Sequence, residues 1–240
     1  MLYVTFYKII MNMAAKIPHL KEIKAPNSLK GMAFQAIKEA IMNEQLRPGK
    51  LYSEPDLAKE LGISRTPIHE ALIELSARGF LKLVPRKGFQ INELHEDDIH
   101  NLYSFRTALE TAVIREITAE ITDKAISEFE AISNKQKRAE EKENWMDFLK
   151  VDRELHYFLA SLTHNNYIIS ALENVRDLID WTGVKILAER KGRPKEALEE
   201  HNAIIDRLKM RDVDGAVSMM KQHLKISEDR VIRFIIRSKQ

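Results

Sequence analysis

Apolar residues recur at helical intervals through the first third of the chain. Three such stretches, at about 28–44, 53–62 and 64–78, each begin at a serine and stop at glycine or proline, which are common helix boundary signals. The β-rich runs FLKLV and GFQIN follow and are joined by a Pro-Arg-Lys-Gly turn. The pattern therefore predicts helix, helix, turn, helix and a hairpin with a basic tip.

This order of elements is that of a winged helix-turn-helix, a unit that binds duplex DNA through its third helix. The same three helices and hairpin also fit a structural or dimerisation module. Periodicity alone leaves both functions open.

From residue 97 onward, apolar-periodic stretches are separated by short breaks, and no strand pattern appears. They cover approximately 97–121, 123–140, 144–162, 166–190, 195–210 and 213–237. The pattern predicts an antiparallel bundle of helices, a common host for internal ligand or metal sites. We therefore expect a mainly α protein with a loose tail at 1–24, a winged helix-turn-helix at 25–92 and an all-helical domain at 97–238.

Composition narrows the class of protein. The 240 residues exceed the usual domain length of about 100 to 200 residues, and 8 Gly and 7 Pro leave few turns for a many-stranded sheet. The lack of cysteine excludes disulfides and thiolate metal sites, so any metal must be bound by His, Asp or Glu. No stretch approaches the roughly 18 apolar residues that span a bilayer, so we expect no membrane partner. The absence of cysteine favours the reducing cytoplasm as the location.

The net charge of +2 hides an asymmetry along the chain. Residues 1–92 carry 14 Lys and Arg against 8 Asp and Glu, a net +6, whereas residues 93–240 carry 24 against 28, a net −4. A basic end on an acidic body favours a polyanion partner for the first part only.

The start of the third predicted helix carries residues suited to binding DNA. Arg65 can bond guanine O6 and N7 in the major groove, and Thr66 can reach a base or a phosphate. The helix N-terminus at Ser64 offers N–H groups to a phosphate. His69 follows Arg65 by one helical turn, so it lies either over the DNA or against the apolar stripe of the helix.

The predicted wing adds a second basic feature. Arg86 and Lys87, followed by Gly88, can contact the DNA backbone or the minor groove. A charged surface turn is the alternative for this pair, as a solvated surface arginine is for Arg65.

Histidine placement is the informative feature of the second half. Asp152 and His156 stand at i and i+4, so both project from one helix face, a usual chelating pair. His201 and His223 each interrupt an apolar stripe, and each lies 11 residues from Asp212 in the break between two helices. In an antiparallel helix pair, equal distances from the turn place both imidazoles at the same height, where they can converge on one point.

Such a set of three imidazoles and one carboxylate suits one divalent metal per subunit: Zn²⁺, Ni²⁺, Mn²⁺ or Fe²⁺, with Zn²⁺ or Ni²⁺ expected as purified. The alternative is that these are core histidines bonded to backbone or to Glu. The other histidines fit no ligand spacing and are expected at the surface: His19, His95, His100 and His164.

Arg106 lies on the apolar stripe of the first helix in the second domain and points partly inward. A bare buried guanidinium is costly. Either Glu110 at i+4 pairs with it, or it binds the carboxylate of a small effector beside the metal.

The stretch YSEPDLAKELGISRTPIHEALIELSARGFLKLVPRKGFQIN resembles the winged helix of the GntR family of bacterial transcription regulators. The shared features include LRPG, DLAKELGISRTP across the turn, EAL-x-x-L in the third helix and a basic wing with glycine. His69 and Pro55 stand where the family usually has arginine. The resemblance implies DNA binding, and the two departures imply an unusual operator.

Residues 97–235 resemble the FCD ligand-binding domain of the FadR-like branch of this family. Its metal-binding members carry D-x-x-x-H, E-H and H-L, and these motifs match Asp152 to His156, Glu200-His201 and His223-Leu224. The resemblance also implies an effector role for Asn165, which matches a frequent asparagine, and is compatible with either role of Arg106.

We therefore expect a homodimeric, metal-containing regulator, a repressor, that binds a palindromic operator and responds to a small organic acid. Dimerisation is expected because one winged helix makes too few contacts for specific affinity near 10⁻⁸ M. The rival is a metalloenzyme that uses the same ligands for hydrolysis, although neither Glu154 nor Glu200 is obviously aimed at a bound water. A DNA-binding scaffold with a silent bundle is the third class.

Overall fold

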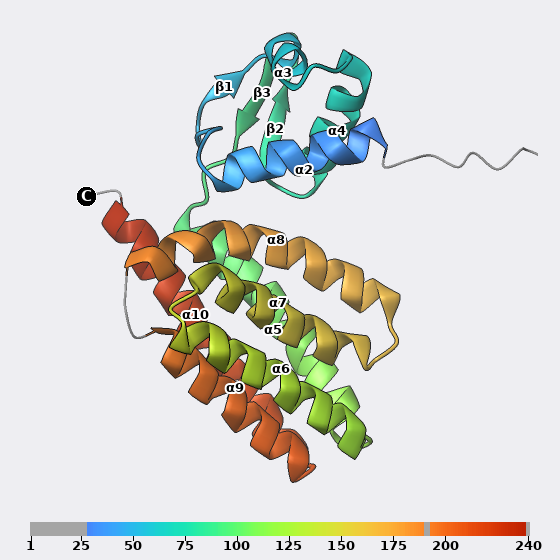
Figure 1. Ribbon diagram of the computed structural model, residues 1–240, viewed down its shortest axis with the longest axis vertical. Coiled ribbons are helices and arrows are strands. Elements are labelled where there is room, and N and C mark those ends of the chain that lie inside the picture. Colours follow the sequence, from blue (N-terminus) through green and yellow to red (C-terminus); the bar gives the residue numbers. More distant parts are fainter. Residues whose placement is uncertain (1–27, 190–192, 239–240) are drawn as a thin grey trace, which may run out of the picture.

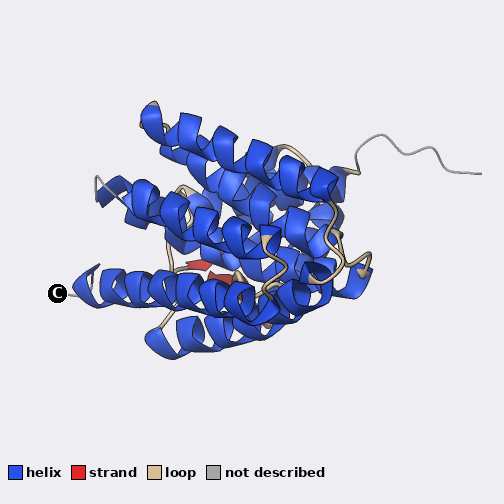
Figure 2. Ribbon diagram, turned by 90° about the horizontal axis from the view of Figure 1, so that it is seen from below, coloured by secondary structure: helices blue, strands red, loops and turns tan. Residues whose placement is uncertain are grey.

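The computed structural model describes residues 28–189 and 193–238. In this part of the chain, a small N-terminal domain lies at one end of a larger helical domain, and a short segment connects them (Figure 1). The predicted tail at 1–24 lies outside the described residues. The structure is mainly helical, as the periodicity indicated, and the strands form one small patch among the helices (Figure 2).

The N-terminal domain has the predicted order of helices and hairpin. Its elements are α2 (Leu29–Met42), β1 (Leu51–Tyr52), α3 (Glu54–Leu61), α4 (Arg65–Ala77), β2 (Leu81–Val84) and β3 (Gly88–Ile91). Ser28 begins α2 by accepting a hydrogen bond from the backbone N–H of Gly31. Gly62 ends α3 in the left-handed conformation, at φ 66°, which turns the chain tightly into α4.

The strands form an antiparallel sheet in the order β1-β3-β2. The strand β1 was not predicted, because two residues are too few to show alternation. Leu51 and Tyr52 pair with Gln90 and Phe89 of β3. Gly88 has φ 121°, and a Cβ there would collide with the carbonyl of Tyr52, so the pairing of β1 with β3 requires glycine.

The core of this domain forms where α2 and α4 meet over the sheet. Its buried residues include Ile37, Ile41, Ile68, Leu72, Leu75, Phe80 and Phe89. Each such side chain contributes about 1.5–3 kcal/mol on burial. Two members of the same cluster, Leu178 and Trp181, belong to helix α8 of the helical domain, so the two domains share a packed surface.

The helical domain consists of α5 (Glu96–Thr118), α6 (Asp123–Glu141), α7 (Trp145–Ser161), α8 (Asn166–Glu189), α9 (Arg193–Lys209) and α10 (Val213–Ser238). Helix α6 packs on α7 and α9, α9 packs on α10, and α10 packs along α5. Helix α8 contacts α7 and lies on the side of the bundle that faces the N-terminal domain (Figure 1). The helix bounds lie within a few residues of those predicted.

No helix in the described part of the chain is long and apolar enough to cross a membrane.

Candidate DNA-binding surface and histidine centre

The N-terminus of α4 presents its polar groups to solvent. Ser64 is the N-cap residue, but its hydroxyl makes no capping bond, so both the hydroxyl and the first-turn N–H groups can meet a phosphate. Arg65 and Thr66 are exposed beside it. The opposite face of the helix, with Ile68 and Leu72 fully buried, anchors this end in the core.

His69 lies on the exposed face of α4 and not against its apolar stripe, because 53% of its side chain is accessible. Its Nδ1 lies 3.2 Å from both carboxylate oxygens of Glu54 at the start of α3. Burial of His69, one of the two predicted alternatives, is therefore wrong. Pro55 stands in the first turn of α3, where proline is compatible with a helix.

The wing residues form the second part of this surface. Arg86 has φ 63° at the tip of the β2–β3 turn, and both Arg86 and Lys87 are exposed. Within the described residues, neither side chain forms an ion pair, and neither does Arg65. Their charges are therefore available to an external polyanion.

Three histidines from three helices meet in the interior of the helical domain: His156 of α7, His201 of α9 and His223 of α10. One ring nitrogen of each lies within 4.8 Å of those of the other two. The ring centroids of His201 and His223 are 4.6 Å apart, which agrees with their equal spacing from the α9–α10 turn. All three side chains are buried.

Each imidazole is held through the same ring nitrogen. Nδ1 of His156 bonds Glu110 at 2.5 Å, that of His201 bonds Gln136 at 2.8 Å, and that of His223 bonds Glu200 at 2.8 Å. An acceptor at Nδ1 fixes the proton there and leaves the Nε2 lone pair for another partner. Nε2 of His201 is buried and has no hydrogen-bond partner within the described residues.

The pKa values of the three histidines favour metal ligation. Burial, assisted by the neighbouring cations, lowers the pKa of His201 to about 3 and that of His223 to about 4. Burial and Arg106 hold the pKa of His156 well below its ordinary value. All three imidazoles are therefore neutral at pH 7, the form that binds a metal.

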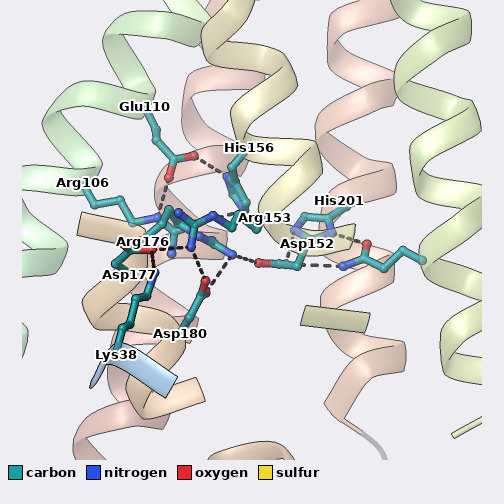
Figure 3. A network of polar contacts seen from close by, with 11 residues as sticks. Lys38, Arg106, Glu110, Asp152, Arg153, His156, Arg176, Asp177, Asp180 and His201 are labelled. Atoms are coloured by element: carbon teal, nitrogen blue, oxygen red, sulfur yellow. Dashed lines mark hydrogen bonds and ion pairs between the residues drawn. The ribbon is translucent and has the colours of Figure 1, made fainter. Parts of the chain in front are cut away.

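Asp152 lies at the edge of this cluster, one turn before His156 on α7. Its Oδ1 is 3.5 Å from Nε2 of His201, and its Oδ2 accepts a 2.5 Å hydrogen bond from Arg176 of α8 (Figure 3). Burial alone would raise the pKa of Asp152, but Arg176 and the neighbouring histidines together outweigh burial and hold the pKa well below its usual range. The carboxylate is thus charged, with one oxygen directed to the histidines.

Arg106 is buried and engaged on two sides. Its Nε donates to Glu110 at 2.5 Å, and its Nη2 lies 3.0 Å from Nε2 of His156. The predicted pairing with Glu110 is therefore present. Arg106 also lines a cavity of about 100 Å³ beside the histidines, together with Tyr103, Phe148, Arg176 and Arg230 among others.

Asn165 lies outside this cavity. Its side-chain oxygen accepts hydrogen bonds from the backbone N–H groups of Tyr167 and Ile168, at the start of α8, and the residue is exposed. Its position is that of a helix-capping residue, and the effector contact that the resemblance implies stays a prediction.

Several residues that hydrogen-bond to the histidines or to Asp152 were not predicted from the sequence. Gln136 continues the buried stripe of Phe129 and Ile132 on α6, so a polar residue on an apolar face was the available signal. Arg176 stands in a run of buried residues on α8 and had the same signal. The sequence gives Glu200 a place in the E-H motif and a rejected role as a catalytic base, whereas in the structure it accepts a hydrogen bond from His223.

The comparisons with known proteins match both domains. Residues 29–91 match the bacterial regulatory proteins of the gntR family, and residues 101–225 match the FCD domain. The uncharacterized HTH-type transcriptional regulator YdhC of Bacillus subtilis (strain 168) is 28% identical over 192 residues, 80% of this chain and 84% of that protein. The HTH-type transcriptional repressor RspR of Escherichia coli (strain K12) is 27% identical over 197 residues, 81% and 86% of the two chains.

Among solved structures, E. coli McbR/YncC is similar in fold, with a TM-score of 0.69 at 19% identity over 89% of this chain and 99% of that one. The relatives and both matched domains are those of transcription regulators and not of enzymes. The chain belongs to the GntR family of bacterial DNA-binding transcription regulators and carries an FCD domain.

Proposed function

We propose that this regulator is a homodimeric repressor whose helical domain binds one divalent metal ion and, beside it, a small carboxylate effector. The observation that carries the proposal is the set of three buried imidazoles, each held through Nδ1 so that Nε2 is left to converge with the others. Core histidines packed only for stability would also need acceptors for their N–H groups. What favours a metal is that the three rings converge and that the buried Nε2 of His201 has no hydrogen-bond partner within the described residues.

The residues that would hold the metal are His156, His201 and His223 through Nε2 and Asp152 through Oδ1. The ligand set fits Zn²⁺, Ni²⁺, Mn²⁺ or Fe²⁺. When bound, such a metal supplies a Lewis-acidic position that accepts a carboxylate oxygen. The hydrolytic alternative is disfavoured, because Glu200 is committed to His223 and Glu154 pairs with Lys135 at the surface.

Arg106 links metal binding to effector binding. The lone pair of Nε2 on His156 serves either the N–H of Arg106 or a metal, but not both. Metal binding would therefore release one arm of the Arg106 guanidinium, while Glu110 continues to hold the other. The released N–H groups line the adjacent cavity, where they suit a carboxylate.

The cavity also limits the effector. A volume of about 100 Å³ corresponds to roughly three water molecules, which suits a small acid. Arg176 and Arg230 line it as further cations, and Phe148, Leu149 and Ile179 give it an apolar side. A small organic acid with a short apolar body fits these features better than a neutral sugar.

The DNA-binding role places Ser64, Arg65, Thr66 and His69 in or over the major groove. Arg86, Lys87 and Gly88 form the wing that contacts the flanking backbone or minor groove. A two-fold dimer on a palindromic operator doubles these contacts. The relative RspR, named as a repressor, supports the repressor role.

The test combines operator selection with ligand response. We expect selection from random duplexes to yield a palindrome, and we expect operator affinity to change when Zn²⁺ is replaced by a chelator or when acetate, pyruvate or succinate is added. Random DNA of equal length is the control. An operator affinity that neither metal nor any acid changes would contradict the effector-responsive function while leaving DNA binding intact.

A further inference from the structure

Charged side chains of alternating sign connect the histidine centre to the DNA-binding domain (Figure 3). The series begins at Asp152 and continues through Arg176, Asp180, Arg153 and Asp177. It ends at Lys38 of α2 and at Arg78, which follows α4. The acid that candidate metal binding would affect is therefore connected to both principal helices of the DNA-binding domain.

Asp177 is the residue that joins the two domains. Only 3% of its side chain is exposed, its Oδ1 lies 2.6 Å from Nζ of Lys38, and its Oδ2 lies 3.3 Å from Nη1 of Arg78. The neighbouring Trp181 packs on Phe80, with ring centroids 5.8 Å apart. Because these contacts all come from α8, this helix sets how the DNA-binding domain is held.

The guanidinium of Arg176 has two acidic neighbours. Its Nη2 bonds Asp152 at 2.5 Å, and the same atom is 3.6 Å from Oδ1 of Asp180, one helical turn away. Nε of Arg176 and Oδ1 of Asp180 are both buried, and neither has a hydrogen-bond partner in the described part of the chain. A small rotation of the guanidinium would let these two groups satisfy each other, so a second arrangement is already built into the site.

At the end of the series nearer the DNA-binding domain, two acids share one cation, and two cations share one acid. Nη1 of Arg153 is shared between Asp180 at 2.8 Å and Asp177 at 2.7 Å. The oxygen of Asp177 that Arg153 contacts is Oδ1, the same atom that holds Lys38. Arg153 holds Oδ2 of Asp180, whereas Oδ1 faces Arg176. If the carboxylate of Asp180 turns to bring Oδ1 to Arg176, Oδ2 moves away from Arg153, which then bonds Asp177 more closely and competes there with Lys38.

We propose that Arg176 is a positioning residue that couples the histidine centre to the hold on the DNA-binding domain, a role that rests on the proposed metal site. A divalent cation at Oδ1 of Asp152 weakens the attraction of this carboxylate for Arg176. Arg176 then bonds Asp180, Arg153 shifts to Asp177, and the contact between Asp177 and Lys38 loosens. Metal binding thereby loosens the contact that holds α2 and α4 against α8, and the DNA-binding domain can then change its orientation on the operator.

Hydrogen exchange of the full-length protein tests this coupling without DNA. Amide exchange in α2, residues 29–42, is measured with Zn²⁺ and with a chelator, and Zn²⁺ affinity is measured on the same samples by titration calorimetry. We expect Zn²⁺ to speed exchange in α2 by about five-fold or more in the wild type. Asp180→Asn should bind Zn²⁺ but lose most of this response, because the neutral amide removes the charged second partner of Arg176.

Two further variants control for the loss of a negative charge elsewhere and for a loss of stability. Glu128→Gln removes an exposed acid of α6 that takes no part in this series of charges, and it should respond as the wild type does. Asp180→Glu restores the charge and should recover part of the response even if the amide variant is less stable. A full Zn²⁺ response in Asp180→Asn, or none in a wild type that binds Zn²⁺, would overturn the coupling alone. Failure of the wild type to bind Zn²⁺ in the calorimeter would overturn the metal site and the coupling with it.

Discussion

Without metal, the histidine centre should make the protein sensitive to mild acid. The perturbation is a fall from pH 7 to pH 5 in the presence of a chelator. In the unfolded chain, histidines take up protons near pH 6.5. In the folded protein, burial lowers the pKa of His201 to about 3 and that of His223 to about 4, and lowers that of His156 as well.

The sign follows from proton linkage. Between pH 6.5 and 4 the unfolded state binds more protons than the folded state, so the free energy of unfolding falls as the pH falls. Proton uptake by the unfolded chain should lower the free energy of unfolding by about 2 kcal/mol for each of His201 and His223 between pH 7 and pH 5, or roughly 4 kcal/mol for the two. His156, whose pKa is also lowered, adds to the loss in the same direction. Asp152, whose pKa is depressed, contributes stability that is lost only below about pH 4, outside this window.

The loss is comparable to the whole stability of a typical domain, about 5–15 kcal/mol. Urea denaturation at the two pH values measures it, with the helical domain followed by circular dichroism. Zn²⁺ should raise the midpoint at both pH values, because a ligand that binds only the folded state stabilises it. An exposed histidine, His164, serves as the control, and His164→Asn should not reduce the pH effect. Equal unfolding free energies at pH 7 and pH 5 would refute the reasoning that the cluster is buried and neutral.

Further predictions concern the DNA-binding surface and the effector site. Arg65→Ala should weaken the binding free energy by about 1–3 kcal/mol on the selected operator and by much less on random DNA, because a bidentate contact to guanine discriminates between bases. Equal losses of affinity on both DNAs in a filter-binding assay would show that Arg65 only contacts phosphate. His69→Arg should shift the selected sequence toward guanine at one symmetric position per half-site, because arginine can bond guanine bidentately and imidazole cannot; identical selected sequences would show that His69 never reads DNA. Arg106→Ala should weaken binding of the responsive acid, measured by calorimetry, by about ten-fold or more, and unchanged acid affinity both in this variant and after metal removal would move the pocket elsewhere.

The fold was largely predictable because its signals are local. Serine caps, terminal glycines and helical periodicity lie within each helix or directly beside it in the sequence, so the bounds of each helix could be predicted to within a few residues. The short strand β1 was missed because Leu51 and Tyr52 pair only through their long-range partners in β3. Two residues carry no pattern of their own.

The histidine set was predictable in part, for geometric reasons. The equal distances of His201 and His223 from Asp212 fix their heights in a helix pair, and the structure brings both rings together with that of His156. The role of Asn165 rests only on the resemblance and stays a prediction, and the structure places its side chain at the start of α8. The hydrogen-bond partners of the three Nδ1 atoms come from other helices, so they depend on how the helices pack and give only weak signals in the sequence.

The contacts between the domains had no sequence signal at all. Asp177 belongs to a buried run on α8, and its partners Lys38 and Arg78 lie far away in sequence. Such ion pairs are set by how two domains dock, which local periodicity does not report. They depend on the folded structure, in which α8 faces the N-terminal domain (Figure 1).

The central claim is that the imidazoles of α7, α9 and α10 bind a metal ion, and metal content tests it most directly. The measurement is elemental analysis of full-length protein purified without chelator or nickel resin, compared with His201→Ala and with the exposed control His164→Ala. We expect one divalent metal per subunit in the wild type and the control and almost none in His201→Ala. Full metal occupancy in His201→Ala, or a wild type that stays metal-free after incubation with Zn²⁺, would contradict it.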